Sequence, residues 1–263
     1  MAIIWSIVKK FVILSSVNTK TNIMRRFLLA ICAIISAVEL SAQEPETTPI
    51  QESRPVKEFL SSFTAIDVDA PIKLTLIKIG EDEAPYIIYD TKGVYTSKFT
   101  IEVERKTSTL KITERNDPKR ESITEVQVYF SSLTDISISK ADVRVEGIID
   151  TNLLDINISN DANFVAEINV LDLKSFVSGK SYILLTGQTR YQTADISTAE
   201  YDATGLQCIS TIAESSHNAI VKVDATERLE AKTSTGGKLY YFTQPVILRS
   251  ETTLFGGEIT LKQ

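Results

Sequence analysis

The chain has 263 residues, of which 28 are basic and 34 are acidic, and its formal net charge at pH 7 is −6. Residues 1–42 hold five of the basic residues and one acidic residue, so the remainder carries 23 basic and 33 acidic side chains, a net charge near −10. A chain this acidic repels phosphate backbones and anionic headgroups. The charge therefore argues against nucleic acid and anionic lipid as partners.

The first 42 residues have the pattern of an upstream extension followed by a secretory signal peptide. Met24 and two arginines precede an apolar run over residues 27–35, and small residues follow up to Ala42. A charged start, an apolar core of about ten residues and a small residue before the cleavage point are typical of such signals. We predict that Met24 is the true start and that cleavage follows Ala42; alternatively, residues 1–23 form a long charged n-region. The expected location is the periplasm, the outer-membrane surface or the medium.

Beyond the signal peptide, no apolar stretch reaches the ~18 residues that a membrane-spanning helix needs, so no membrane insertion is expected after the signal is removed. Cys208, the one cysteine left, cannot form an intrachain disulfide. We expect this thiol to be buried among apolar groups, since a reactive cysteine needs nearby positive charge. Burial and backbone pairing alone must therefore hold the fold together.

Residues 43–58 are polar and rich in proline, which predicts a flexible leader. Over residues 59–132 apolar and polar residues alternate, a pattern typical of strands that are buried on one face. No window beyond the signal peptide shows a convincing 3.6-residue period, so no helix is expected there. The predicted strands of this N-terminal section are Ile66–Val68, Ile72–Leu76, Phe99–Val103, Leu110–Ile112 and Val126–Phe130.

Residues 133–263 contain an internal repeat. A short strand that ends in serine recurs, with its serine at positions 139, 159, 178, 197, 216 and 234, so the spacing is 18 to 20 residues. A polar turn and a second alternating run follow each serine, and in the first and fourth copies this run starts one residue earlier. A period near twenty indicates stacked units, each too small to bury its apolar face alone.

We therefore predict an all-β chain, in which the strand-rich N-terminal section leads into a β-solenoid, or β-helix, of about six 19-residue rungs over residues 133–263. A partial seventh copy at residues 254–261 would close its C-terminal end. The alternative is an antiparallel sandwich with evenly spaced strands, which also produces alternation. Six copies in the same phase favour the solenoid.

At these residues the chain resembles the bacterial family named putative auto-transporter adhesin, head GIN domain. Phe63 stands just before the first isoleucine strand, as in that family, and Ser178–Ser181 keeps its Ser-Gly-x-Ser turn, whereas other repeats keep the serine alone. The resemblance covers about residues 59–261. It implies a β-helical fold and an exported protein. Because the family has no agreed ligand or activity, it implies no site residues.

No pattern predicts a catalytic, cofactor or metal site. His217, the only histidine, lies in a predicted turn beside serines that recur in every repeat, so a Ser–His pair there is expected by chance. One histidine and one cysteine cannot form a zinc cluster. Glu200 and Asp202 share one repeat, but the aligned positions in neighbouring repeats are Tyr182 and Ile220. The second, stacked carboxylate that a glycosidase would need is therefore missing.

One outward surface is a candidate partner site. If Ile183 points inward, then Tyr182 and Leu184 point outward, and Ile220 and Tyr240 share that phase. Aromatic and aliphatic side chains exposed in register along a solenoid face are typical of a surface that binds a partner or a glycan. Alternatively, the N-terminal section packs over this face and hides it.

These predictions together favour a non-catalytic binding or adhesion module of the cell envelope. Its partner would be an unknown glycan or protein at the cell surface, and a homo-oligomer is left open. The first alternative is a structural envelope or periplasmic protein with no external ligand. A carbohydrate-active β-helix enzyme is a remote third, which a cleft with paired carboxylates would favour. We predict neither enzyme activity nor a cofactor.

Overall fold

The structure is a computed structural model that describes residues 54–92, 98–115, 122–253 and 255–262. Every regular element in these ranges is a β-strand. None of the described residues forms a helix long and apolar enough to span a bilayer. The predicted translation start, signal peptide and cleavage point lie outside the described residues.

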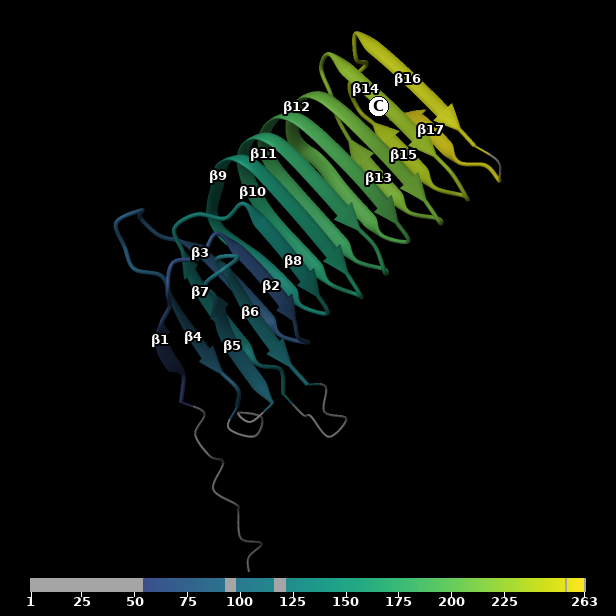
Figure 1. Cartoon of the computed structure of the whole chain (residues 1–263). Helices are drawn as coiled ribbons and strands as arrows, with labels where there is room; N and C mark the ends of the chain where they lie inside the picture. The colour runs from purple at the N-terminus through teal and green to yellow at the C-terminus, as the bar shows by residue number, and fades with distance from the viewer. Residues whose placement is uncertain (1–53, 93–97, 116–121, 254, 263) are drawn as a thin grey trace, which may run out of the picture. The chain divides into compact units, whose positions relative to one another are not determined.

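Figure 1 labels the strands in chain order. The strands up to the repeat region are β1 (Val56–Phe59), β2 (Ala65–Asp69), β3 (Lys73–Lys78), β4 (Tyr86–Asp90), β5 (Phe99–Glu104), β6 (Thr109–Glu114) and β7 (Glu125–Phe130). Those of the repeat region are β8 (Asp135–Ser139), β9 (Asp142–Ser159), β10 (Asn163–Val177), β11 (Tyr182–Ser197), β12 (Glu200–Ser216), β13 (Ile220–Val223), β14 (Arg228–Thr233), β15 (Lys238–Tyr241), β16 (Ile247–Thr252) and β17 (Glu258–Leu261).

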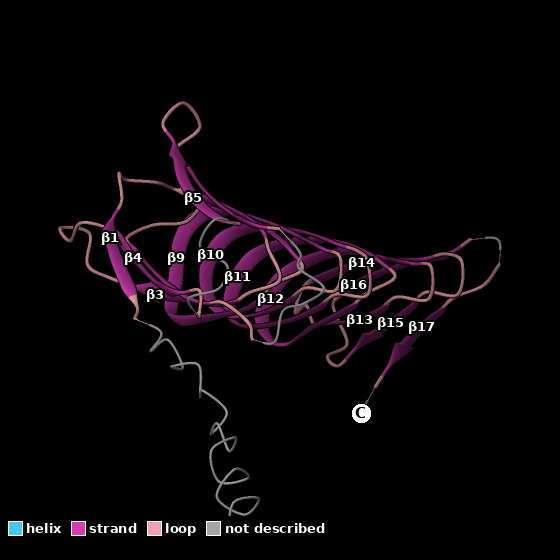
Figure 2. Cartoon of the chain, turned by 90° about the horizontal axis from the view of Figure 1, so that it is seen from below, coloured by secondary structure: helices cyan, strands magenta, loops and turns pink. Residues whose placement is uncertain are grey.

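Two parallel ladders of strands make up the solenoid. The first ladder contains β6, β2, β8, the C-terminal parts of β9 to β12, β14 and β16, in that spatial order. The second contains β7, β3, the N-terminal parts of β9 to β12, β13, β15 and β17. Figure 2 shows β13, β15 and β17 side by side in the second ladder. From β8 onward the chain makes about 7 turns, which confirms the predicted all-β solenoid.

The parallel pairing starts earlier in the chain than residue 133, where the solenoid was predicted to begin. β2 pairs with both β6 and β8, and β3 pairs with both β7 and β9, so the N-terminal section supplies two further rungs. Ile66, for example, is in register with Ile136. Local alternation identified these strands but not their partners, because partners so far apart in sequence leave no periodic signal.

Three antiparallel strands lie beyond the rung formed by β6 and β7, which is the first rung in space. β5 pairs with β6, β4 pairs with β7, and β1 pairs with β4. β1 begins at Val56, so residues 56–58 belong to the sheet rather than to the leader predicted over residues 43–58. All four residues of β1 are exposed, and the apolar residues of β4 are adjacent rather than alternating. Neither segment therefore carries the period-two pattern that indicates a strand.

Each serine that ends a repeat is followed by a turn in the left-handed backbone region. A single residue with positive φ follows Ser139 and Ser197, whereas two such residues follow each of the other serines. This difference explains why the second run starts one residue earlier in the first and fourth repeats. At Gly179 an added Cβ would lie 2.7 Å from the Asn160 backbone nitrogen, so this turn requires glycine.

The interior is filled by large and small side chains that complement each other. In one inward column of the first ladder, Ile156 is followed by Ser175, Ala194 and Ala213. The fully buried ring of Tyr201 comes from the second ladder, and its phenol oxygen lies 3.3 Å from the Ser175 hydroxyl oxygen. The small residues thus make room for the ring, as close packing of the core requires.

Candidate binding site

The partner face predicted from the sequence is the outer surface of the second ladder. Ile183 is fully buried, whereas Tyr182 and Leu184 are half-buried on the opposite side of β11. Ile220 and Tyr240 take equivalent outward positions in β13 and β15. Among the described strands, β1, β4 and β5 pair edge to edge at the first rung, so they do not cover these four residues.

Charged side chains interrupt this face. Glu200 lies in register between Tyr182 and Ile220. In the next outward column, Asp202 and Lys222 lie between the other two predicted residues. The four predicted residues therefore do not form one continuous apolar stripe.

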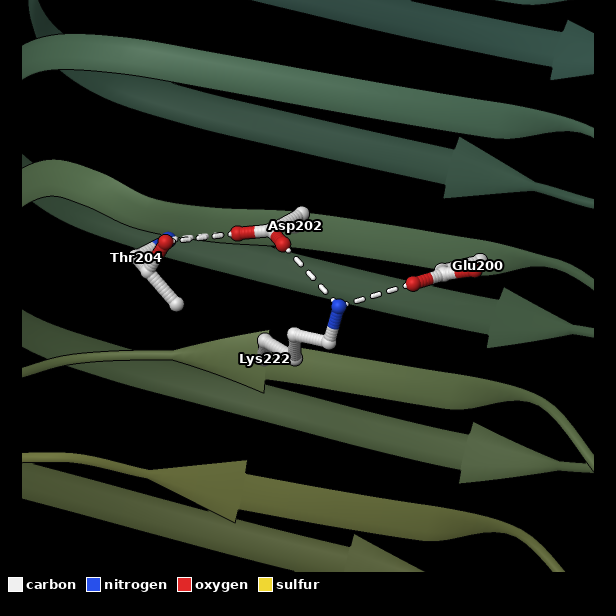
Figure 3. A network of polar contacts seen from close by, with 4 residues as sticks. All are labelled: Glu200, Asp202, Thr204 and Lys222. Carbon is white, nitrogen blue, oxygen red and sulfur yellow. Dashed lines mark hydrogen bonds and ion pairs between the residues drawn. The ribbon is translucent and has the colours of Figure 1, made fainter. Parts of the chain in front are cut away.

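Figure 3 shows how these charges are arranged. Lys222 Nζ lies 2.8 Å from Glu200 Oε1 and 3.1 Å from Asp202 Oδ2. Asp202 Oδ1 also accepts hydrogen bonds from the Thr204 backbone N–H, at 3.1 Å, and from the Thr204 hydroxyl, at 2.7 Å. The sequence singled out the two carboxylates but missed Lys222, which follows Asp202 by one rung in the same column.

The electrostatics of this cluster are those of a structural ion pair network. The hydrogen bond to Glu200 contributes most to raising the pKa of Lys222, and Asp202 adds to it. Burial by itself would raise the pKa of the Asp202 carboxyl, but hydrogen bonds from Thr204 and Lys222 outweigh it and hold this pKa below its ordinary value. A general acid in a glycosidase needs the opposite, a raised carboxyl pKa.

A separate groove lies at the bend that leads into the first ladder. It has a volume of about 610 Å³ and crosses four successive rungs. β10, β11 and β12 each place three consecutive residues in it, and the segment between β13 and β14 contributes three more. The lining residues are Asn169, Val170, Leu171, Gln188, Thr189, Arg190, Gln207, Cys208, Ile209, Asp224, Ala225 and Thr226.

A ladder of polar side chains, three of them amides that line the groove, runs across the rungs. Asp150, Asn169, Gln188 and Gln207 are in register on adjacent rungs. Asn169 Nδ2 donates to Asp150 Oδ2 at 3.2 Å, and Gln188 Nε2 donates to Asn169 Oδ1 at 2.9 Å. The sequence reasoning missed this ladder, although its members recur every 19 residues, which is the period of the repeat.

Two residues after the amides on the same strands, the lining includes exposed aliphatic groups. Leu171 is 52% exposed and Ile209 is 36% exposed, and Arg190 lies on the rung between them. Tyr191, also 52% exposed, follows directly, and the Arg190 guanidinium carbon lies 6.0 Å from the centre of its ring. The groove thus combines hydrogen-bonding amides with exposed aliphatic groups two residues further along the same strands, and an aromatic ring lies beside it.

The floor contains groups that are already engaged within the protein. Cys208 is buried, as predicted; burial raises the pKa of its thiol, and Sγ lies 3.2 Å from the Ser210 carbonyl oxygen. Asp224 accepts hydrogen bonds from the Thr243 N–H, at 2.8 Å, and from the Thr243 hydroxyl, at 2.7 Å. Both groups therefore make hydrogen bonds within the protein.

His217 lies in an exposed turn, as the repeat predicts. Its Nδ1 lies 3.1 Å from the Ser197 hydroxyl oxygen and 3.2 Å from that of Ser216. Its backbone φ of 52° places it in the left-handed region. Across the part of the chain that the structure describes, no group of three or more His, Cys, Asp or Glu side chains is placed to hold a metal ion.

The fold and the groove define the class: a β-solenoid of parallel ladders with a groove of mixed polarity across its rungs. The sequence model of the family described as putative auto-transporter adhesin, head GIN domain, matches residues 62–245, and the chain therefore belongs to this family. No curated protein matches the chain.

Solved structures share the fold at low sequence identity. A putative adhesin from Bacteroides fragilis is 16% identical with a TM-score of 0.70, and the match covers 80% of this chain and 97% of that one. A putative adhesin from Parabacteroides merdae is 16% identical with a TM-score of 0.54, covering 79% and 95%. A structure from Parabacteroides distasonis, titled as a putative lipid binding protein, is 16% identical with a TM-score of 0.55, covering 80% and 98%.

Proposed function

We propose that this protein is an exported, non-catalytic adhesion module of the cell envelope, and that its groove holds a glycan chain. The observation that carries the proposal is the amide ladder of Asn169, Gln188 and Gln207 beside the exposed Leu171 and Ile209. Amides offer both donors and acceptors to sugar hydroxyls, while exposed aliphatic groups pack against the apolar faces of sugar rings. Stacked rungs hold these groups rigidly, which lowers the entropic cost of binding.

A groove across four rungs suits an extended ligand. Rungs repeat at about 4.8 Å, so the amides present the same chemistry at a regular interval along the solenoid. A peptide would bind such a fold by adding a strand to an open edge, but this groove is lined by side chains. These features support a polymer with repeated hydroxyl groups in preference to a peptide.

The outer face with Tyr182, Leu184, Ile220 and Tyr240 remains the second candidate surface. Its half-buried rings and aliphatic groups would support binding by stacking. The charge cluster around Lys222 divides it, and for that reason we favour the groove.

The test is a glycan array probed with the purified protein and two double variants. Gln188→Ala with Gln207→Ala alters the groove, and Tyr182→Ala with Tyr240→Ala alters the outer face. Loss of two polar contacts should weaken binding of an array glycan by about tenfold or more in the groove variant alone. Loss confined to the outer-face variant would move the site there. If no array glycan binds, the glycan proposal is wrong and the structural envelope role gains.

The proposed export has its own test. Protease added to intact cells should degrade the protein if it is on the cell surface, as detected with an antibody to residues 59–263. Protection until the outer membrane is opened would indicate a periplasmic protein. That result would remove most of the support for adhesion.

A further inference from the structure

The two ends of the solenoid differ in how their strand edges are paired. Within the described residues, β16 pairs only with β14, and β17 pairs only with β15. At the other end, β5 covers β6 and β4 covers β7. Among the strands that the structure describes, the last rung therefore has two edges without a partner strand, side by side. Open edges offer unpaired N–H and C=O groups that recruit further strands.

The backbone groups that face this open end follow from the pairing on the other side. The Ile247 N–H donates to the Glu227 carbonyl at 2.8 Å, so alternate residues of β16, including Ser250, direct their backbone groups outward. The Glu258 N–H donates to the Gly237 carbonyl at 3.0 Å, so Ile259 of β17 faces outward. Both strands can thus pair with an additional strand without losing a bond within the chain.

The sequence of each edge strand complements itself in the antiparallel direction. When two copies of β16 are centred on Ser250, Arg249 of each copy lies opposite Glu251 of the other. When two copies of β17 are centred on Thr260, Ile259 lies opposite Leu261 of the second copy. The same arrangement also places Glu258 opposite Lys262 of the second copy. Both centres agree with the direction of the backbone groups. Ser250 directs its N–H and C=O outward and would form a hydrogen-bonded pair with Ser250 of the second copy. Thr260 directs its backbone groups toward β15 and would form a non-hydrogen-bonded pair with its counterpart.

A single two-fold axis serves both strand pairs. Through the parallel register, Ser250 belongs to the column of Ala213, and Thr260 belongs to the column of Lys222. Ala213 and Lys222 are equally far along the chain from the turn at His217–Asn218 that joins their strands. The two centres therefore lie opposite each other across the solenoid, as one axis perpendicular to its length requires.

The charges along the outer surface continue across such an interface. Glu214, Lys232 and Glu251 form one outward column of alternating sign, in which Lys232 Nζ lies 3.3 Å from Glu214 Oε1. Arg249 of a second copy would stand next in this column. Charged residues anywhere on an edge discourage aggregation, but here they have opposite signs at positions that the axis brings together.

We propose that two copies of this chain associate through their last rungs, β16 against β16 and β17 against β17, into one continuous two-fold symmetric solenoid. Leu248, Ile259 and Leu261, which are only partly buried at the open end, become enclosed in the joined core. An isologous contact of this kind closes on itself and stops at two copies. The dimer goes beyond the proposed adhesion and does not depend on the groove.

The test measures molar mass by light scattering on protein purified from cells that express the full chain, over a roughly hundredfold range of concentration, because dimerisation follows mass action. The expected mass at the upper end is that of two copies. Ser250→Lys places two lysines against each other at the axis and should give the mass of one copy with an unchanged circular dichroism spectrum. Asn152→Lys, the same charge change at an exposed residue of β9, should leave the dimer intact.

Charge reversal tests the register. Arg249→Glu alone sets like charges opposite each other and should weaken association, and adding Glu251→Arg should restore it. The restoration would occur although Arg249 loses its contact of 3.3 Å to Glu230 within the chain. A single-copy mass at every concentration would overturn the proposal. A dimer that withstands Ser250→Lys would overturn it equally, because its contact would lie elsewhere.

Discussion

Removal of the buried Tyr201 hydroxyl tests whether hydrogen bonds between side chains stabilise the solenoid interior. Tyr201 is fully buried, and its oxygen accepts a hydrogen bond from Gln192 Nε2 at 2.7 Å. The Thr211 hydroxyl lies 3.2 Å from Gln192 Oε1, so the amide is held at both ends. Tyr201→Phe removes one oxygen and leaves the Gln192 N–H group buried without that acceptor.

The expected cost is about 1–3 kcal/mol, the price of an unsatisfied buried polar group. For a chain of this size, each kcal/mol lowers the melting temperature by about 2–4 °C, so the expected fall is about 2–12 °C. Thermal unfolding followed by circular dichroism measures it. Tyr182→Phe is the matched control, since its hydroxyl lies on the outer face, and it should stay within about 0.5 kcal/mol of the parent.

A second substitution and a pH series sharpen the test. Adding Gln192→Leu removes the amide that Tyr201→Phe leaves without its acceptor. The double variant should therefore lose less unfolding free energy than the two single variants lose together. Burial raises the pKa of Tyr201 to about 12, from its ordinary value of 10.0. A raised folded-state pKa gives stability that is present below pH 10 and lost as the pH rises toward 12. The advantage of the parent over Tyr201→Phe should therefore shrink in that interval. A Tyr201→Phe variant as stable as its parent at pH 7 would refute the buried network.

Two further pairs of variants test which side chains of β11 point inward and whether the bend at residue 187 requires glycine. Ile183→Asp buries an unpaired charge and should unfold the domain, whereas Leu184→Asp on the outer face should be tolerated. Equal melting curves for the two variants would show that the assignment of inward and outward side chains is wrong. Gly187→Ala would put a Cβ 2.1 Å from the Ile168 carbonyl oxygen at a φ of +107° and should cost more than about 2 kcal/mol. At Gly256, where φ is also positive but nothing lies within 4 Å, Ala should cost only about 1 kcal/mol, and equal losses at both sites would exclude the clash as the cause.

The solenoid was predictable because its signals are local and repeat. Each copy ends in serine and continues into a turn that needs left-handed backbone, so the period and the inward phase of residues such as Ile183 can be read along the chain. The variation in turn length at Ser139 and Ser197 was also visible as a shift of one residue. Stacking identical units then leaves few alternatives for the fold.

The candidate site was less predictable, because it depends on which side chains the winding brings together. Asn169, Gln188 and Gln207 carry the repeat period, but nothing in the sequence shows that the bend beside them is concave. The interruption of the outer face by Lys222 depends on pairing between rungs. Register between strands decides both, and register is a property of the assembled ladder.

The sequence by itself determined most of the strands, their alternating faces, the repeat period and the all-β class, since each of these arises from local alternation or from contacts between copies of the repeat; β1 and β4, which lack the alternation, are the exceptions. Only the tertiary structure decided that β6 and β7 precede β2 and β3 in space and that β1, β4 and β5 cover the first rung. It also decided that no other described strand pairs with the outer edges of β16 and β17. These features join segments that are far apart in the chain and follow no period. Their formation depends on which edge remains unpaired after the repeats have stacked, and no local pattern records that.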